Sequence, residues 1–252
     1  MNGLKGKRAL VTGGSRGIGG ATALLLAEYG VDVAIGYRSR RADADALVAN
    51  LSERYGVNTF AHATDISTVT GADELIDRAC TALGGLDFFV GNAGIWPVED
   101  VSLADMTDEH WRRTMAENVD SVFFTTRAAI QRISDNGRIV LVSSTAGQRG
   151  EAFHADYAAS KGAMISLVKS LAPELGKRGI TVNSVAPGWV ETEMCAEPFA
   201  NGGRERIAAN IPIGRIAAAR DIAGPIVFLC SELARHVTGE ILNANGGSVL
   251  CG

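Results

Sequence analysis

Short apolar runs alternate with longer helix-like stretches along the whole chain. GIGGATALLLAEYG and TGADELIDRACTALGG are examples of the helix-like stretches. The apolar runs are RALVT (8–12), VDVAIGY (31–37), VNTFAHAT (57–64), LDFFVGN (86–92), GRIVLVSS (137–144), GITVNSVAP (179–187) and EILNAN (240–245). Runs that are apolar throughout and spaced by helices favour a parallel sheet covered on both faces. The pattern predicts one α/β domain over residues 1–252, with a doubly wound, parallel sheet of about seven strands and helices on both faces.

Two segments interrupt this alternation. Residues 118–133 extend the helix before GRIVLVSS, and residues 190–212, VETEMCAEPFANGGRERIAANIP, form a long insertion before the last helix. Insertions at the carboxyl ends of parallel strands commonly cover ligands, so residues 190–212 are predicted to be a substrate lid. The alternative is a surface loop that covers no ligand.

Composition narrows the class of protein. A hydrophobic content of 46% and a charged content of 21% are ordinary for a soluble globular protein, and the net charge of −4 gives no field that favours nucleic acid or an anionic membrane. No segment approaches the roughly 20 apolar residues of a membrane span, and MNGLKGKRALVTGG holds no apolar run of signal-peptide length. We expect a cytoplasmic protein without a membrane or nucleic-acid partner.

The residue types that commonly bind metals are scattered along the chain. The cysteines form no C-x-x-C pair, and the histidines show no ligand spacing. They are Cys80, Cys195, Cys230 and Cys251, and His62, His110, His154 and His236. We expect reduced thiols and no metal site.

The segment TGGSRGIG (12–19) follows the first predicted strand and opens the first helix. Glycine lets the backbone turn tightly and approach a pyrophosphate, which then lies at the helix N-terminus. The spacing of Gly13, Gly17 and Gly19 differs from the plain G-x-G-x-x-G fingerprint, but its place after a strand predicts a Rossmann-type dinucleotide site. A tight turn without a ligand is the alternative.

The end of the second predicted strand indicates which dinucleotide fits. NAD sites often carry an acidic residue there, whereas NADP sites use basic side chains. Here the strand ends in GYRSRR, with Tyr37 in place of the acid and Arg38 after it, and Arg16 can approach the same phosphate. We expect NADP(H), with NAD(H) as the alternative, and interpret Arg40 and Arg41 as solvated charges.

Two further strand ends carry candidate cofactor contacts. Asp65, in TDIS (64–67), can accept a hydrogen bond from an adenine amino group with Ile66 against the ring, or can cap the following helix. GNAG (91–94) offers small residues that let the backbone run against a flat ligand face.

The stretch DYAASKGAM (156–164) places Tyr157 and Lys161 four residues apart, on one face of a predicted helix. An ammonium beside a phenol stabilises the phenolate. The pair therefore predicts a tyrosine whose pKa falls from about 10 and which exchanges protons near neutral pH. A half-buried ring beside a solvated lysine is the alternative that this pair alone leaves open.

Taken in order, these motifs resemble the short-chain dehydrogenase/reductase family over the full chain. The resemblance rests on TGGSRGIG, NAG, Asn118, Ser144, YAASK, PG at 187–188 and Thr192. It implies an oxidoreductase that interconverts a ketone and a secondary alcohol, with Asn118, Ser144, Tyr157 and Lys161 as catalytic residues. The implied cofactor-binding residues are Gly13, Ser15, Arg16, Gly17, Ile18, Gly19, Tyr37, Arg38, Ser39, Asp65, Ile66, Asn92, Ala93, Gly94, Tyr157, Lys161, Pro187, Gly188, Val190 and Thr192.

The resemblance also implies a role for each catalytic residue. Tyr157 would donate a proton to the carbonyl oxygen during reduction, or remove one from the alcohol in reverse. Lys161 would lower the pKa of Tyr157 and bind the nicotinamide ribose hydroxyls. Ser144 would hydrogen-bond the substrate oxygen, and Asn118 would hold a water that links Lys161 to solvent.

Within the family, PGWVETEM, IPIGRI, DIAGPIVFL and TGEILNANGG are similar to motifs of 3-oxoacyl-[acyl-carrier-protein] reductases. This implies an acyl-carrier-protein partner, met by basic residues near the site entrance, and Arg178 matches one such position. Ser134, Asp135 and Asn136 replace a second basic run, which disfavours that partner. An alcohol, sugar or steroid dehydrogenase is the alternative, and a non-catalytic dinucleotide-binding regulator is another.

Side chains near the expected substrate pocket have two interpretations each. Glu151 and His154, in GEAFHADY, can touch substrate or be exposed loop residues. Trp96, Phe153 and Trp189 can line an apolar pocket or pack in the core.

The family resemblance implies a homotetramer built through the long helices and the C-terminal segment. The apolar face of 118–133 and the tail GGSVLCG suggest the same.

Overall fold

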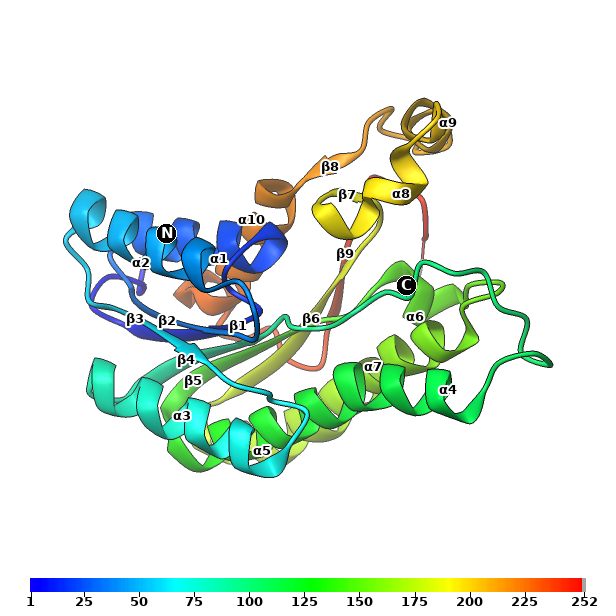
Figure 1. The fold of residues 1–252 in the computed structure, drawn as a ribbon. Coiled ribbons are helices and arrows are strands. Elements are labelled where there is room, and N and C mark those ends of the chain that lie inside the picture. The colour runs from blue at the N-terminus through cyan, green and yellow to red at the C-terminus, as the bar shows by residue number, and fades with distance from the viewer. Residues whose placement is uncertain (251–252) are drawn as a thin grey trace.

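In the computed structural model, which describes residues 1–250, seven strands form one parallel sheet in the order β3-β2-β1-β4-β5-β6-β9 (Figure 1). Every neighbouring pair of these strands is parallel. The strands are β1 (Arg8–Thr12), β2 (Asp32–Tyr37), β3 (Thr59–Ala63), β4 (Leu86–Gly91), β5 (Ile133–Val142), β6 (Thr181–Pro187) and β9 (Ile241–Ala244). The predicted fold class is confirmed.

Helices cover both faces of this sheet (Figure 1). One face carries α1 (Gly17–Glu28), α2 (Arg41–Tyr55) and α10 (Ala219–Cys230), and the other carries α3 (Val69–Leu83), α5 (Ser121–Arg132) and α7 (Ala155–Leu175). Two hydrophobic cores result. Val11 and Ile35 belong to the first core, and their neighbours Leu10 and Ala34 belong to the second. Because successive strand side chains point to opposite faces, strands buried on both faces must be apolar throughout.

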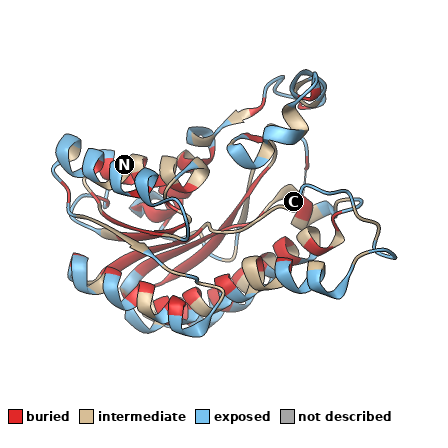
Figure 2. Ribbon diagram, viewed as in Figure 1, coloured by how far each residue is buried: buried red, intermediate tan, exposed pale blue. Residues whose placement is uncertain are grey.

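Burial follows the same three-layer plan. Figure 2 shows buried residues along the strands and on the inward faces of the helices, with exposed residues on the outer faces. No helix within residues 1–250 combines the length and apolarity that a membrane crossing requires.

The strand order reverses between β1 and β4. The chain leaves β1 for α1 on one face. It leaves β4 for α4 (Asp108–Met115), a π-helical turn at Ala116–Asp120, and α5 on the other face. The connections therefore diverge at the carboxyl ends of these two strands, which is where ligands bind in doubly wound sheets.

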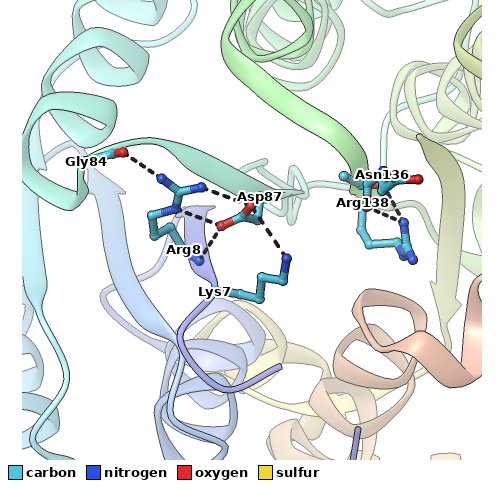
Figure 3. Close-up of polar contacts among 7 residues, drawn as sticks. Lys7, Arg8, Gly84, Asp87, Asn136 and Arg138 are labelled. Carbon is cyan, nitrogen blue, oxygen red and sulfur yellow. Dashed lines mark hydrogen bonds and ion pairs between the residues drawn. The ribbon is translucent and has the colours of Figure 1, made fainter. Parts of the chain in front are cut away.

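Strand β5 begins earlier than the sequence pattern predicts. It starts at Ile133, and its register against β4 shifts, because Leu86 pairs with Ile133 whereas Phe88 pairs with Arg138. Asn136 takes a positive φ of 61° in the intervening bulge, a conformation that asparagine tolerates. The Arg138 side chain donates to the Asn136 carbonyl oxygen at 2.6 Å (Figure 3).

The inserted segment 190–212 folds into short elements that stand away from the sheet (Figure 1). They are β7 (Val190–Glu191), a 3₁₀ turn at Glu193–Cys195, α8 (Ala196–Phe199) and α9 (Gly203–Ala209). Strand β7 pairs with β8 (Ala217–Ala218), just before α10, which anchors both ends of the segment.

Exposed apolar residues occur on both segments for which the sequence predicts subunit contacts. Phe123 on α5 is exposed, and Leu250 in the tail is 89% exposed. Cys251 and Gly252, at the end of that tail, lie outside the described residues. Assembly into a tetramer stays a prediction.

An ion pair fastens β1 to β4 near the amino ends of these strands, opposite the edge where ligands bind in doubly wound sheets (Figure 3). The buried carboxylate of Asp87 accepts hydrogen bonds from the Arg8 backbone N–H at 3.0 Å, from Nε at 2.7 Å and from Nη2 at 3.1 Å. Burial on its own raises the pKa of Asp87, but the hydrogen bonds and charge of Arg8 outweigh it and leave the pKa lowered.

Asp87→Asn should lower the free energy of unfolding by roughly 1–2 kcal/mol at pH 7, because hydrogen bonds to a charged group become neutral ones. The pKa of Asp87 is lower in the folded protein than in the unfolded chain, where it is about 3.9, so the ionised carboxylate stabilises the fold fully above that pH. This contribution is lost as the pH falls through the folded-state pKa. Denaturant unfolding of both proteins at pH 7 and pH 3 should therefore show a difference that shrinks in acid. Asp77→Asn, at an exposed pair with Arg132, is the control and should change stability less.

Candidate active site

A cavity of about 570 Å³ opens at the carboxyl ends of the central strands. Nearly all predicted cofactor residues line it: Gly13, Ser15, Arg16, Gly17, Ile18, Tyr37, Arg38, Ser39, Asp65, Ile66, Asn92, Ala93, Gly94, Tyr157, Lys161, Pro187, Gly188, Val190 and Thr192. Ser144 also lines the cavity, whereas Gly19 and Asn118 are not among its lining residues.

The glycine segment forms a backbone cradle between β1 and α1. Gly13 and Gly17 have positive φ values of 62° and 55°, which side chains rarely allow. A Cβ at Gly19 would lie 2.3 Å from the Gly13 carbonyl oxygen, so Gly19 lets the helix pack against the loop. The first turn of α1 carries no acidic side chain, so its N–H groups can face an anion. These features fit the pyrophosphate of a dinucleotide.

Thr12 ties this cradle to the end of β4. Its Oγ1 accepts hydrogen bonds from the backbone N–H groups of Asn92 and Ala93, both at 3.0 Å. The Asn92 side chain returns the contact by donating to the carbonyl oxygens of Thr12 at 3.0 Å and Gly13 at 3.2 Å. The two strand ends therefore form one rigid floor, and Thr12 is a positioning residue that the sequence reasoning missed.

Asn118 lies in the π-helical turn and is fully buried. Its Oδ1 accepts from the Ile95 N–H at 2.7 Å, and its Nδ2 donates to the Ile95 carbonyl and to Ser160 Oγ, both at 3.0 Å. The side chain thus fastens the loop after β4 to α7. Single π-turns inside helices often occur at functional sites. A water held by Asn118 stays a prediction.

Tyr157 and Lys161 lie one turn apart on α7, as predicted. The Lys161 Nζ is 5.8 Å from the centroid of the Tyr157 ring, and it donates to the Val142 carbonyl oxygen at 3.0 Å. Lys161 is 5% exposed, so it is not the solvated lysine of the alternative interpretation. Ser144 caps α6 (Thr145–Arg149) by accepting from the Ala146 N–H at 3.1 Å.

Burial sets the protonation equilibria of this pair. It raises the pKa of Tyr157 above its ordinary value; a hydrogen bond with Ser144 offsets this in part, and the charge of Glu151 adds to it. Burial also lowers the pKa of Lys161 to about 8. In the protein alone, the prediction that Lys161 lowers the pKa of Tyr157 is wrong, because desolvation of the phenol outweighs an ammonium that is directed at the Val142 carbonyl.

Three arginines gather where the second strand ends. Arg38 pairs with Glu117 on the π-helical turn, Arg16 pairs with Glu193 of the inserted segment, and Arg40 Nη2 lies 2.7 Å from the same Glu193 Oε2. Arg40 is exposed, as expected for a solvated charge, but it also lines the cavity and pairs with Glu193. Arg41 does not line it and pairs with Asp45 on the exposed face of α2. The two glutamates lie far from these arginines in sequence, so the sequence pattern gave no signal for them.

Asp65 shapes a turn before α3. Its Oδ1 accepts from the N–H of Ser67 at 3.0 Å and from the Ser67 hydroxyl at 2.7 Å, and these bonds lower its pKa. The residue that caps α3 is Thr68, whose Oγ1 accepts from the Gly71 N–H at 3.1 Å, so the helix-cap interpretation of Asp65 is wrong. The adenine contact stays a prediction.

Aromatic rings enclose the other end of the cavity. Trp96 and Trp189 line it, with ring centroids 6.1 Å apart in an edge-on arrangement. His154 stacks on Trp96 at 4.8 Å and is buried, so it is not an exposed loop residue. Phe153, at a positive φ of 65°, is 57% exposed and does not line the cavity. Glu151 does line it.

Arg178 lies away from the cavity. It precedes β6, whose far end carries Pro187 at the cavity. Its guanidinium donates to Asp135 Oδ1 at 2.9 Å and to the carbonyl oxygens of Ile130 at 2.9 Å and Ile133 at 2.6 Å. Within this chain the Arg178 side chain therefore stabilises the end of α5, and a carrier-protein contact at this residue stays a prediction.

Metal-binding residues do not gather anywhere in residues 1–250, since no group of three or more candidate ligands occurs there. Cys80, Cys195 and Cys230 are free thiols, and Cys251 lies outside the described residues.

Known proteins match the chain over nearly its whole length. The family model described as enoyl-(acyl carrier protein) reductase matches residues 13–248. The chain is 38% identical over 246 residues to the 3-oxoacyl-[acyl-carrier-protein] reductase FabG of Vibrio harveyi, covering 97% of this chain and 98% of that protein. It is 38% identical over 245 residues to FabG of Escherichia coli strain K12, covering 96% and 97%.

Solved structures agree with this result. A short-chain dehydrogenase from Burkholderia cenocepacia J2315 in complex with NADP superposes with a TM-score of 0.91 at 38% identity, covering 98% of this chain and 99% of that one. A blue fluorescent protein from a metagenomic library in complex with NADPH gives a TM-score of 0.91 at 36% identity, with the same coverage.

Gly19→Ala should weaken dinucleotide binding at least about tenfold, since the new methyl group would force the Gly13 carbonyl oxygen out of the cradle. Gly20→Ala is the matched control, because a Cβ there meets its nearest atom, the Gly14 carbonyl oxygen, at an ordinary 3.5 Å. Fluorescence titration with NADPH and NADH would measure both variants. Equal affinities for the two variants would contradict the cradle.

Proposed function

The chain belongs to the short-chain dehydrogenase/reductase family, and from this premise we propose that it is an NADP(H)-dependent oxidoreductase that interconverts a ketone and a secondary alcohol. The observation that carries the proposal is the meeting of Ser144, Tyr157 and Lys161 with the glycine cradle in one cavity. The dinucleotide, when bound, supplies or accepts the hydride. The cradle fits its pyrophosphate, and side chains of the protein donate or accept the proton.

Tyr157 is the proton donor to the carbonyl oxygen in reduction and the acceptor from the hydroxyl in oxidation. Ser144 donates a hydrogen bond to the same oxygen and stabilises the negative charge that develops there. With its pKa lowered to about 8, the Lys161 ammonium can release a proton near neutral pH, which suits a group that reprotonates Tyr157 after each turnover. Asn118 keeps α7 and the loop after β4 in place around them.

The preference for NADP(H) rests on the arginines that line the ribose end of the cavity. Guanidinium groups bind a phosphate dianion through paired hydrogen bonds, and Arg16, Arg38 and Arg40 can converge on one phosphate. The two structural neighbours described above contain NADP and NADPH, which supports the same preference.

Two substrate classes compete. The identity of 38% to two 3-oxoacyl-[acyl-carrier-protein] reductases favours a 3-oxoacyl group. The position of Arg178 away from the cavity, and its engagement with Asp135 and two carbonyl oxygens, disfavour a carrier protein as the partner. We favour a small carbonyl compound that enters beneath segment 190–212, which we interpret as the substrate lid.

Tyr157→Phe should reduce the turnover number about 10²- to 10⁴-fold with any accepted ketone, because it removes the proton donor and keeps the ring. Affinity for NADPH should stay near that of the wild type. Lys161→Ala should lower turnover and NADPH affinity together. Tyr55→Phe, which removes only an exposed hydrogen bond to Glu28, is the control. A Tyr157→Phe protein that keeps most of its activity would overturn the mechanism.

Glu193→Gln should tighten NADPH binding about threefold to tenfold, since exposed ion pairs contribute up to about 1 kcal/mol each and Glu193 holds both Arg16 and Arg40. Affinity for NADH, which lacks the 2′-phosphate, should not change. Glu191→Gln is the matched control in the same segment, because Glu191 pairs with Arg204 instead. Wild-type protein that binds NADH as tightly as NADPH would contradict the proposed cofactor.

A further inference from the structure

Glu151 is an acidic side chain at the substrate end of the cavity. It lies in the loop between α6 and α7, and it lines the cavity together with Ser144 and Tyr157. The side chain is half-buried, and burial raises the pKa of its carboxyl group. Its charge raises the pKa of the Tyr157 phenol, and the two side chains line the same cavity.

The other acidic side chains that line the cavity already have partners. Glu117 pairs with Arg38, Glu191 with Arg204, Glu193 with Arg16 and Arg40, and Asp65 accepts from Ser67. Among residues 1–250, Glu151 forms no ion pair of this kind. The charges of His154 and Arg149 and a hydrogen bond with Trp96 lower its pKa only enough to offset part of the effect of burial. A carboxylate has about four acceptor positions, so it keeps the capacity to bind a donor.

The walls around Glu151 are aromatic and held in place. Trp96 is fixed by the buried His154 that stacks on it, and Trp189 is packed between Trp96 and Phe199, whose ring centroid lies 5.9 Å away. These rings form part of the cavity wall, and a partly buried carboxylate there gains from each further hydrogen-bond donor that a substrate offers.

We propose that Glu151 selects substrates that carry a hydrogen-bond donor, either a hydroxyl or an ammonium group, beside the reacting carbonyl or carbinol carbon. The inference rests on the proposed function and names its substrate class: hydroxyketones or aminoketones and the corresponding diols or amino alcohols. A plain ketone or a 3-oxoacyl thioester presents only acceptors and methylene groups at this position. Such a substrate displaces water from Glu151 without replacing its hydrogen bonds.

Three ketones of nearly equal shape test the proposal. 2-Hydroxyacetophenone, 2-aminoacetophenone and propiophenone place a hydroxyl, an ammonium and a methyl group beside the same carbonyl, and each has a ring for the aromatic walls. With NADPH, wild-type kcat/KM for the first two should exceed that for propiophenone at least about tenfold, because only they offer a donor to the half-buried carboxylate.

Glu151→Gln separates the two kinds of donor. The amide keeps the shape and one acceptor but cannot balance a positive charge. kcat/KM for the aminoketone should therefore fall at least about tenfold and that for the hydroxyketone should fall less, while propiophenone should be unaffected or improve. Glu99→Gln removes the same charge from an exposed residue that does not line the cavity, and it should leave the order of the three substrates unchanged. NADPH affinity should be unaltered in both variants, which shows that they fold.

Wild-type protein that reduces propiophenone as well as the other two overturns the inference, as does a Glu151→Gln protein in which all three rates change equally. Reduction of simple ketones or 3-oxoacyl thioesters without reduction of any of the three overturns the inference and leaves the proposed function standing. Failure to reduce any carbonyl compound with NADPH contradicts the proposed function itself.

Discussion

The hydroxyl of Thr12 joins the two strands between which the order of the sheet reverses. Its oxygen accepts hydrogen bonds from the N–H groups of Asn92 and Ala93, each at 3.0 Å, and these bonds hold the ends of β1 and β4 together although their connections leave for opposite faces. The cradle that begins at Gly13 and the loop that Asn118 fastens to α7 both start from this joint. The position of the cradle relative to Tyr157 on α7 is therefore fixed by hydrogen bonds of the Thr12 and Asn118 side chains.

Burial explains the chemistry of the central pair better than their mutual attraction does. Tyr157 and Lys161 each resist their charged form, because the low dielectric around them penalises the phenolate and the ammonium alike. In the protein alone, burial therefore disfavours the Tyr157 phenolate and favours release of a proton from Lys161.

The sequence was sufficient for those features that depend on local spacing. Strand positions follow from continuous apolar runs, the glycine cradle from the motif TGGSRGIG, and the placement of Tyr157 and Lys161 on one face from the helical period of 3.6 residues. The structure confirms the fold that these features predict. Features that depend on contacts between distant segments were not accessible. The pairing of Arg40 with Glu193 spans 153 residues. The start of β5 at Ile133 was also not predicted, because the polar Asn136 in its bulge is typical of a turn.

The raised pKa of Tyr157 was not predictable from the sequence for a related reason. Helix geometry places Lys161 on the correct face, but it does not reveal that the Val142 carbonyl oxygen of the neighbouring strand receives the ammonium. Arg178 is a similar case, since its donors are taken up by the carbonyl oxygens of Ile130 and Ile133. Hydrogen-bond partners on adjacent elements decide what a charged side chain is free to do, and a single sequence carries no record of them.

The charged side chains that line the cavity differ between its two ends. Arginines gather at the ribose end, each held by a carboxylate that an incoming phosphate can replace, whereas the substrate end carries Glu151 within its aromatic walls. The proposed cofactor preference rests on the arginines at one end, and the proposed substrate class rests on the carboxylate that lines the cavity together with Tyr157.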